Sequence, residues 1–259
     1  MEREGKNRKK LASDSARRIM EASQTRDSCV ANNATGCAAG SDGSSVSFIS
    51  RHMRCSTAIA GDQKLIQIVD AALAEATSKS GNWLVCRAGC TQCCMGVFAI
   101  NQLDALRLRQ GLADLETRDA ERAARIRVRA LEAVARLSLS FPGNPTTGVL
   151  DEGAEAEQRF ANFANEEPCP VLDPETGLCE LYESRPMTCR VFGPPVRSED
   201  GLGVCELCYH GASDEEIAAC EMKTDFGALE SRLLRELQRR TGARGETIIA
   251  FCLASSIAS

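Results

Sequence analysis

Four cysteines lie within nine residues of this chain, in the segment Cys86-Arg-Ala-Gly-Cys90-Thr-Gln-Cys93-Cys94. Two or three residues between cysteines form a tight turn that can point two sulfurs at one centre. Zinc and iron–sulfur sites use thiolate ligands at such spacings and need about four of them. The segment therefore predicts a metal site, or part of one.

Five more cysteines follow in a later segment that is rich in proline and glycine, which bend the chain back on itself. The last two form a second short-spaced pair, with two residues between them. Nine thiols exceed one tetrahedral site and suffice for two four-ligand sites, or for one iron–sulfur cluster with spare cysteines. The predicted metal ligands are Cys86, Cys90, Cys93, Cys94, Cys169, Cys179, Cys189, Cys205 and Cys208.

Some assignments stay open at this point. Adjacent cysteines usually point apart, so Cys93 and Cys94 could serve one centre or two. His210 follows Cys208 by two residues and could add a nitrogen ligand, although a lone histidine is more often a surface or packing residue. The spacing of the remaining cysteines matches no metal site, and we assign no role to Cys29, Cys37, Cys55, Cys220 and Cys252.

Positive charge lies close to the predicted ligands. A tetrathiolate site around zinc is negative and needs donors or cations nearby, which Arg87, Arg185 and Arg190 could supply. Pro186 suits the first turn of a helix, with Ser184 as a possible cap, so Cys189 would lie near a helix N-terminus where the thiolate is favoured.

The surrounding sequence predicts helices that position these segments. Apolar residues recur at three and four positions from Asp62, and Gly81-Asn82 ends this helix. Asn101 caps another helix, which Gly111 interrupts, and Thr117 begins the next. Further helices are expected at 154–163, after the capping box at Ser213, and around Leu229–Leu237, whereas 247–253 is ambiguous between helix and strand.

Composition agrees with a mainly α fold: aromatic residues are only 4%, and Leu and Ala carry most of the apolar content. We expect a disordered tail over 1–60 and a cysteine-cluster metal-binding domain over 61–259, with helices around an irregular cysteine-rich centre. No long apolar run or secretory signal is evident, so we expect no membrane partner and a cytoplasmic location. A net charge of −5 makes nucleic acid an unlikely partner.

The order and spacing of the cysteines carry a resemblance. The motifs, in order, are Cys86-x3-Cys90-x2-Cys93-Cys94, Cys169-Pro-Val-Leu172, Gly177-x-Cys179-x-Leu181-Tyr182 and Arg185-Pro186-x-x-Cys189-Arg190-x-Phe192. Together they resemble the YkgJ-type cysteine-cluster family over roughly 83–210. That family is described as a zinc- or iron-chelating domain. The resemblance implies that Cys86 to Cys94, Cys169, Cys179 and Cys189 chelate metal, with Cys205 and Cys208 as later members, and that helices over about 101–165 are an insertion.

Three functions are compatible with these observations. The first is a metal-chelating protein, in which zinc or an iron–sulfur cluster organises the fold. The second is an iron–sulfur enzyme, because Cys86-x3-Cys90-x2-Cys93 has the spacing of radical S-adenosylmethionine enzymes and some relatives of the family are flagellin lysine N-methylases. The third is a zinc-stabilised interaction module that uses the Arg-rich helix at 118–136. The metal ion is the partner common to all three, and the sequence decides neither the metal nor whether a reaction is catalysed.

Overall fold

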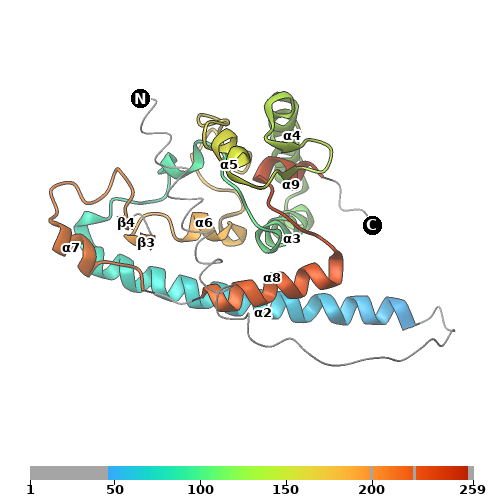
Figure 1. Ribbon diagram of the computed structural model, residues 1–259, viewed down its shortest axis with the longest axis horizontal. Coiled ribbons are helices and arrows are strands. Elements are labelled where there is room, and N and C mark those ends of the chain that lie inside the picture. Colours follow the sequence, from blue (N-terminus) through green and yellow to red (C-terminus); the bar gives the residue numbers. More distant parts are fainter. Residues whose placement is uncertain (1–45, 199–200, 224–225, 256–259) are drawn as a thin grey trace.

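A computed structural model describes residues 46–198, 201–223 and 226–255, with the backbone alone described over 46–60. The described chain is mainly helical, as the composition predicts (Figure 1). The predicted tail lies outside the described residues over 1–45. The helix expected from Asp62 is described from Val46 onward, and the division of the chain into a tail over 1–60 and a domain over 61–259 stays a prediction.

The long helices are α2 (Val46–Ser80), α3 (Gln102–Arg118), α4 (Ala120–Leu137) and α8 (Gly227–Thr241). Shorter ones are α5 (Ala154–Ala161), α6 (Met187–Arg190), α7 (Asp214–Ala219) and α9 (Ile249–Ala254). Single 3-10 turns are η1 (Gly81–Trp83), η2 (Gln92–Cys94), η3 (Ser138–Ser140) and η4 (Tyr182–Ser184). Two small antiparallel hairpins pair β1 (Gly143–Asn144) with β2 (Val149–Leu150), and β3 (Val196–Ser198) with β4 (Gly201–Gly203).

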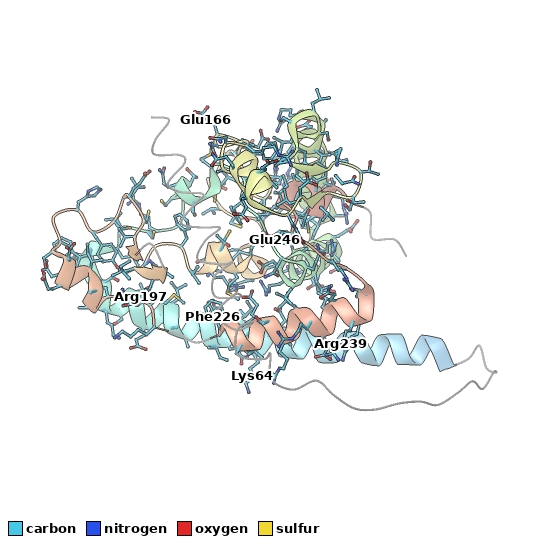
Figure 2. All side chains as sticks on the ribbon, viewed as in Figure 1. Lys64, Glu166, Arg197, Phe226, Arg239 and Glu246 are labelled. Carbon is cyan, nitrogen blue, oxygen red and sulfur yellow. The ribbon has the colours of Figure 1, made fainter. Side chains whose placement is uncertain are left out.

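Helices α2 and α8 lie side by side along one edge of the molecule (Figure 1). Their apolar stripes form a core in which Leu65 and Val69 of α2 are fully buried and Leu233 and Leu237 of α8 nearly so. Phe226, just before α8, packs into the same core (Figure 2). Because Met187 of α6 joins this cluster, the α2–α8 pair also supports the cysteine-bearing segment.

A second helical group consists of α3, α4 and α9. Ile126 and Ala130 of α4 are fully buried against α3 and α9, and Val171 and Leu181 from the cysteine-rich segment join the same core. The ambiguous segment 247–253 is resolved as an extended approach, with Ile100 and Thr247 bridged, followed by helix α9. The helices between Cys94 and Cys169 thus share a core with the cluster segment; that they are an insertion in the family pattern stays a prediction.

Caps and breaks follow the sequence in part. The Asn101 side chain accepts hydrogen bonds from the Leu103 and Asp104 amides, as predicted, and the capping box at Ser213 is present. The expected interruption at Gly111 is wrong, because α3 continues through it. A Cβ at position 111 would lie 2.1 Å from Ser184 Oγ, so this glycine allows η4 to approach the helix. The break falls at Asp119, whose side chain caps α4.

The cysteine segments have little regular structure, as predicted. An isolated antiparallel bridge between Met95 and Pro168 places the two cysteine-bearing stretches side by side, and a second bridge joins Leu172 to Cys179 within the later stretch. The Cys169 amide donates to the Cys94 carbonyl at 2.8 Å, which also joins the two stretches. In the described ranges, no helix combines the length and the apolar character needed to cross a membrane.

Glu230 of α8 provides a stability prediction. Its carboxyl is 3% exposed and accepts a hydrogen bond from Asn101 Nδ2 at 3.0 Å. Burial raises its pKa from 4.5 to about 7, and the nearby Asp104 raises it further, while Asn101 and Arg107 oppose the shift. The folded state therefore retains a proton that the unfolded chain releases, so this contribution to stability is complete below pH 4.5 and is lost as the pH rises through 7.

Glu230→Gln should therefore raise the free energy of unfolding at pH 8 by about 2 kcal/mol and flatten its pH dependence between 4.5 and 7. Urea unfolding as a function of pH measures both effects. Glu236→Gln is the control, since that side chain lies in the same helix and is 31% exposed. Equal pH profiles for the wild type and Glu230→Gln would show that Glu230 does not titrate in this range.

Candidate metal centre

Three of the predicted ligands meet at one point. The sulfurs of Cys86, Cys205 and Cys208 all lie within 4.8 Å of one another, and Cys86 Sγ is 4.0 Å from Cys208 Sγ. Sulfurs around a tetrahedral zinc with Zn–S bonds of 2.3 Å are about 3.8 Å apart. These three cysteines, the three-thiol group, therefore have nearly the spacing of metal ligands, and their donor set suits zinc or iron equally.

The backbone brings the two halves of the three-thiol group together. The Tyr209 amide donates to the Trp83 carbonyl at 3.0 Å, and the Tyr209 hydroxyl shares a hydrogen bond of 2.5 Å with Ser80 Oγ. The Gln92 side chain donates to the Glu206 carboxylate. The Cys205–Cys208 turn is thus joined to η2 through Glu206, and the residue that follows it is joined to the end of α2 and to η1.

Gly193 makes room for the Cys86 thiol. A Cβ at position 193 would lie 3.3 Å from Cys86 Sγ, and the residue has φ of +124°, which L side chains rarely adopt. The chain after α6 can therefore pass close to the sulfur only because position 193 lacks a side chain.

The remaining clustered thiols form a second set, the five-thiol group, which consists of Cys93, Cys94, Cys169, Cys179 and Cys189. Cys93 interacts electrostatically with each of the other four, and also with Cys205 of the three-thiol group. In the part of the chain that the structure describes, only the three-thiol group places three Cys, His, Asp or Glu ligand atoms within 4.8 Å of one another. The five-thiol group is therefore more open and would have to contract around a metal.

The environment of Cys169 and Cys189 in the second set suits thiolates only when a cation is bound. Burial raises the pKa of Cys169 to about 12, although hydrogen bonds from the Val171 and Leu172 amides lower it. Burial and the neighbouring thiols also raise the pKa of Cys189. A bound cation would displace the thiol protons, so metal affinity should fall as the pH falls.

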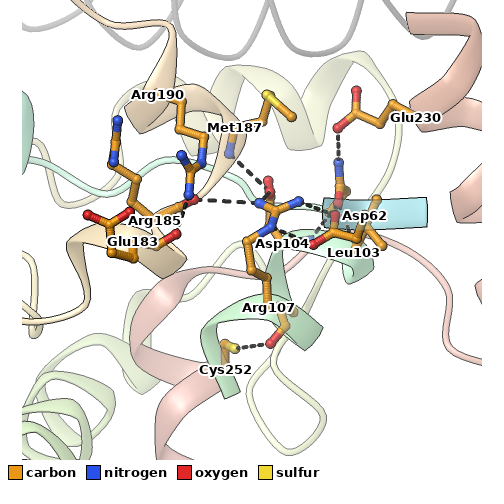
Figure 3. A network of polar contacts seen from close by, with 12 residues as sticks. Asp62, Leu103, Asp104, Arg107, Glu183, Arg185, Met187, Arg190, Glu230 and Cys252 are labelled. Atoms are coloured by element: carbon orange, nitrogen blue, oxygen red, sulfur yellow. Dashed lines mark hydrogen bonds and ion pairs between the residues drawn. The ribbon is translucent and has the colours of Figure 1, made fainter. Parts of the chain in front are cut away.

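A buried polar network holds α6, and with it Cys189 (Figure 3). The Arg190 guanidinium is 1% exposed and donates to both Asp70 carboxylate oxygens of α2, at 2.7 and 2.9 Å, and to the Glu183 carbonyl. The Met187 amide donates to Asp104 Oδ1 of α3 at 3.0 Å. Helix α6 is therefore fixed from both helical groups.

This network corrects two expectations. Ser184 does not cap α6, because it belongs to η4 and the residue before α6 is Pro186. Asp104 of another helix supplies the acceptor that a local cap would provide. Arg190 pairs with Asp70 rather than compensating thiolates, and Arg87 is exposed. Cys189 does lie in the first turn of α6, as expected.

Arg185 is the cation associated with the five-thiol group. It is 8% exposed, its Nη1 donates to the Tyr182 carbonyl at 2.9 Å, and its guanidinium stacks 3.9 Å from the Tyr182 ring centroid. After the hydrogen bond from Cys94, which has the largest effect, its positive charge contributes to lowering the pKa of Cys93. Arg185 therefore offsets part of the negative charge of a metal–thiolate centre.

Arg185→Met should lower metal affinity about tenfold, the range found for residues that support metal ligands. Arg185→Lys, which keeps the charge, should lose less. Competition against a chromophoric chelator under anaerobic, reducing conditions measures this affinity. Arg197→Met is the matched control, because Arg197 forms an exposed ion pair with Glu221. An affinity of Arg185→Met equal to that of the control would exclude this electrostatic role.

The other cysteines and the histidine are placed as follows. Cys90 lies in a turn, with its amide donating to the Arg87 carbonyl at 3.0 Å, and is outside the three-thiol group. His210 is exposed and is also outside that group. Buried Cys220 and Cys252 bind backbone carbonyls through their thiols, so they are packing residues. Cys29 and Cys37 lie outside the described residues, as does the side chain of Cys55.

Sequence reasoning missed the residues that position the ligands. Asp104 carries a signal, because it lies four residues before Leu108 on the buried stripe of α3, where a carboxylate needs a partner. Gly193 and Asp70 have no recognisable signal in the sequence, because their roles depend on which distant segments pack against them.

Fold and site together define a helical protein whose irregular, cysteine-rich centre has the donors and spacing for metal chelation. Residues 85–209 match the family model described as "CxxCxxCC: Putative zinc- or iron-chelating domain", so this segment of the chain is similar to that family. Neither a curated protein nor a solved structure matches the chain.

Proposed function

We propose that this protein binds zinc or iron through the thiolates of its cluster cysteines and that the metal organises the irregular centre of the fold. The observation that carries the proposal is the convergence of Cys86 with Cys205 and Cys208, which are far apart in sequence yet have sulfurs within 4.8 Å. Grouped thiols of raised pKa are unfavourable as anions, and a bound cation offsets that cost.

The enzyme alternative finds less support. A radical S-adenosylmethionine enzyme would need Cys86, Cys90 and Cys93 around one cluster. Cys86 instead lies with Cys205 and Cys208, and neither Cys90 nor Cys93 joins them within the 4.8 Å that these three sulfurs share. The geometry of the described thiols therefore supports this chemistry less than the spacing suggests.

The interaction-module alternative depends on free arginines along α4. Several of them are used within the chain: Arg122 and Arg129 pair with the buried Glu180, and Arg136 pairs with Glu167 at 2.6 Å. Arg127 pairs with Glu116 of α3 at 2.6 Å. These contacts explain the Arg-rich helix as an element that fastens the cysteine segment to the helical group.

Anaerobic purification followed by elemental analysis and a visible spectrum tests the proposal. Zinc without visible absorption indicates a zinc protein, and iron with sulfide and visible absorption indicates an iron–sulfur protein. We expect at least one equivalent of metal in the wild type, and Cys208→Ser should bind less metal than the wild type does. A stably folded protein that binds neither metal would refute the proposal.

A further inference from the structure

The clustered thiols are divided unequally between two places. The three-thiol group uses the segment after α2 and the turn before α7, whereas the five-thiol group uses η2, the stretch after α5, and α6. The two sets are neighbours, because α2 contacts both through Ser80 and Asp70, and Gln92 of η2 donates to Glu206. They differ in how closely their sulfurs converge and in how many thiols they contain.

The three-thiol group opens to solvent on one side. Cys205 and Cys208 are 7% and 4% exposed, whereas Cys86 is exposed. The neighbouring side chains of Val85 and Leu207 are 43% and 40% exposed, so the described chain leaves the outer side of the group uncovered. A ligand from solution could reach a metal held there.

The number of ligands also differs. Three thiolates leave a tetrahedral ion one ligand short, and the described Cys, His, Asp and Glu residues place no fourth ligand atom within 4.8 Å of all three sulfurs. The five-thiol group has enough thiols to close a four-ligand site by itself. Closed coordination is typical of structural metal sites, and an open position is typical of sites where an ion binds water or an external ligand.

We propose that the chain holds two metal centres, and that the one at Cys86, Cys205 and Cys208 keeps an open coordination position for a small soft ligand such as a thiol. This inference rests on the proposed function and specifies its site. Binding is a ligand exchange: an incoming thiol loses its proton to solvent, its sulfur bonds the metal, and the bound water leaves. The outer centre can then take part in exchanging metal with other thiols, whereas the inner one is structural.

Cobalt(II) titration of the metal-free, full-length chain under anaerobic conditions tests this proposal, with absorption reporting thiolate coordination. We expect the wild type to bind two equivalents, and Cys208→Ser and Cys189→Ser to bind one each. Added 2-mercaptoethanol should change the spectrum of the wild type and of Cys189→Ser but leave that of Cys208→Ser unchanged. Cys252→Ser is the matched control, because its buried thiol lies in neither group and serine can donate to the same Ala105 carbonyl.

Each other outcome is informative. A single equivalent that both variants lose would show one centre and overturn the inference while leaving metal binding intact. Two equivalents that 2-mercaptoethanol does not affect would show that both sites are closed. No binding by the wild type would refute the proposed function itself. If a variant fails to fold, the rate of zinc release from the wild-type protein to a competing chelator provides the test instead. Two centres of unequal access should release zinc in two kinetic phases, and an added thiol should accelerate only one of them. A single phase would overturn the inference.

Discussion

Removing the metal with a chelator under reducing conditions should unfold the cysteine segments and leave both helical groups folded. The segments have few backbone ladder bonds, and part of their own core consists of the thiols Cys205, Cys208 and Cys220. The α2–α8 and α3–α4–α9 groups each bury an apolar core of their own. Structural zinc contributes roughly 10–16 kcal/mol to the folding of small metal domains. Its removal should therefore cost more free energy than the other contacts of these segments contribute.

Hydrogen exchange of the metal-loaded and metal-free chain measures this effect. Amides around Cys94 and Cys169 should exchange at least about 100-fold faster without metal, while those in the middle of α4 change little. Adding zinc or iron back should restore protection. Unchanged protection throughout would show that the metal does not organise the fold, and loss of protection in α4 would show that the two parts unfold as one unit.

Arg190→Met should lower the free energy of unfolding by about 1–3 kcal/mol, because it removes the donor from the hydrogen-bond partners of a buried guanidinium. The guanidinium is 1% exposed and joins Asp70 of α2 to the Glu183 carbonyl before α6. Methionine fills part of the volume but leaves that carbonyl without its donor. Because α6 carries Cys189, metal affinity should fall as well.

Urea unfolding at a fixed excess of metal measures the loss. Asp70→Asn should have an effect of similar sign, since it leaves a buried cation without its counter-charge. Arg197→Met should cost less than about 1 kcal/mol, because its ion pair with Glu221 is largely exposed. An effect of Arg190→Met no larger than that of Arg197→Met would contradict the role assigned to the network.

Helix positions were predictable wherever the local signal was strong. Asn101 and Ser213 cap helices as their sequences predict, and the leucine spacing around Leu233 predicts α8. Gly111 misled because its lack of a side chain serves the packing of η4, which no local pattern records. The cytoplasmic location stays a prediction.

The metal-chelating centre was predictable from cysteine density, but the grouping of the cysteines was not. Short spacing predicts that Cys86, Cys90 and Cys93 share a centre. In the structure, the 3-10 turn at Gln92–Cys94 and the hydrogen bond from the Cys169 amide to the Cys94 carbonyl attach Cys93 and Cys94 to the later segment. Long-range packing therefore decides which thiols meet, and the spacing of cysteines in the sequence does not report that packing.

The meeting of Cys86 with Cys208 has a consequence for how the protein is made. A ribosome that has just added Cys94 must add about 115 further residues before Cys208 exists, which takes roughly 6–23 s at 5–20 residues per second. During that interval Cys86 is a reduced thiol without both of its partners, and it is open to oxidation and to competing metals. The order of synthesis thus makes the first cysteine segment the vulnerable one, and metal loading a late step in maturation.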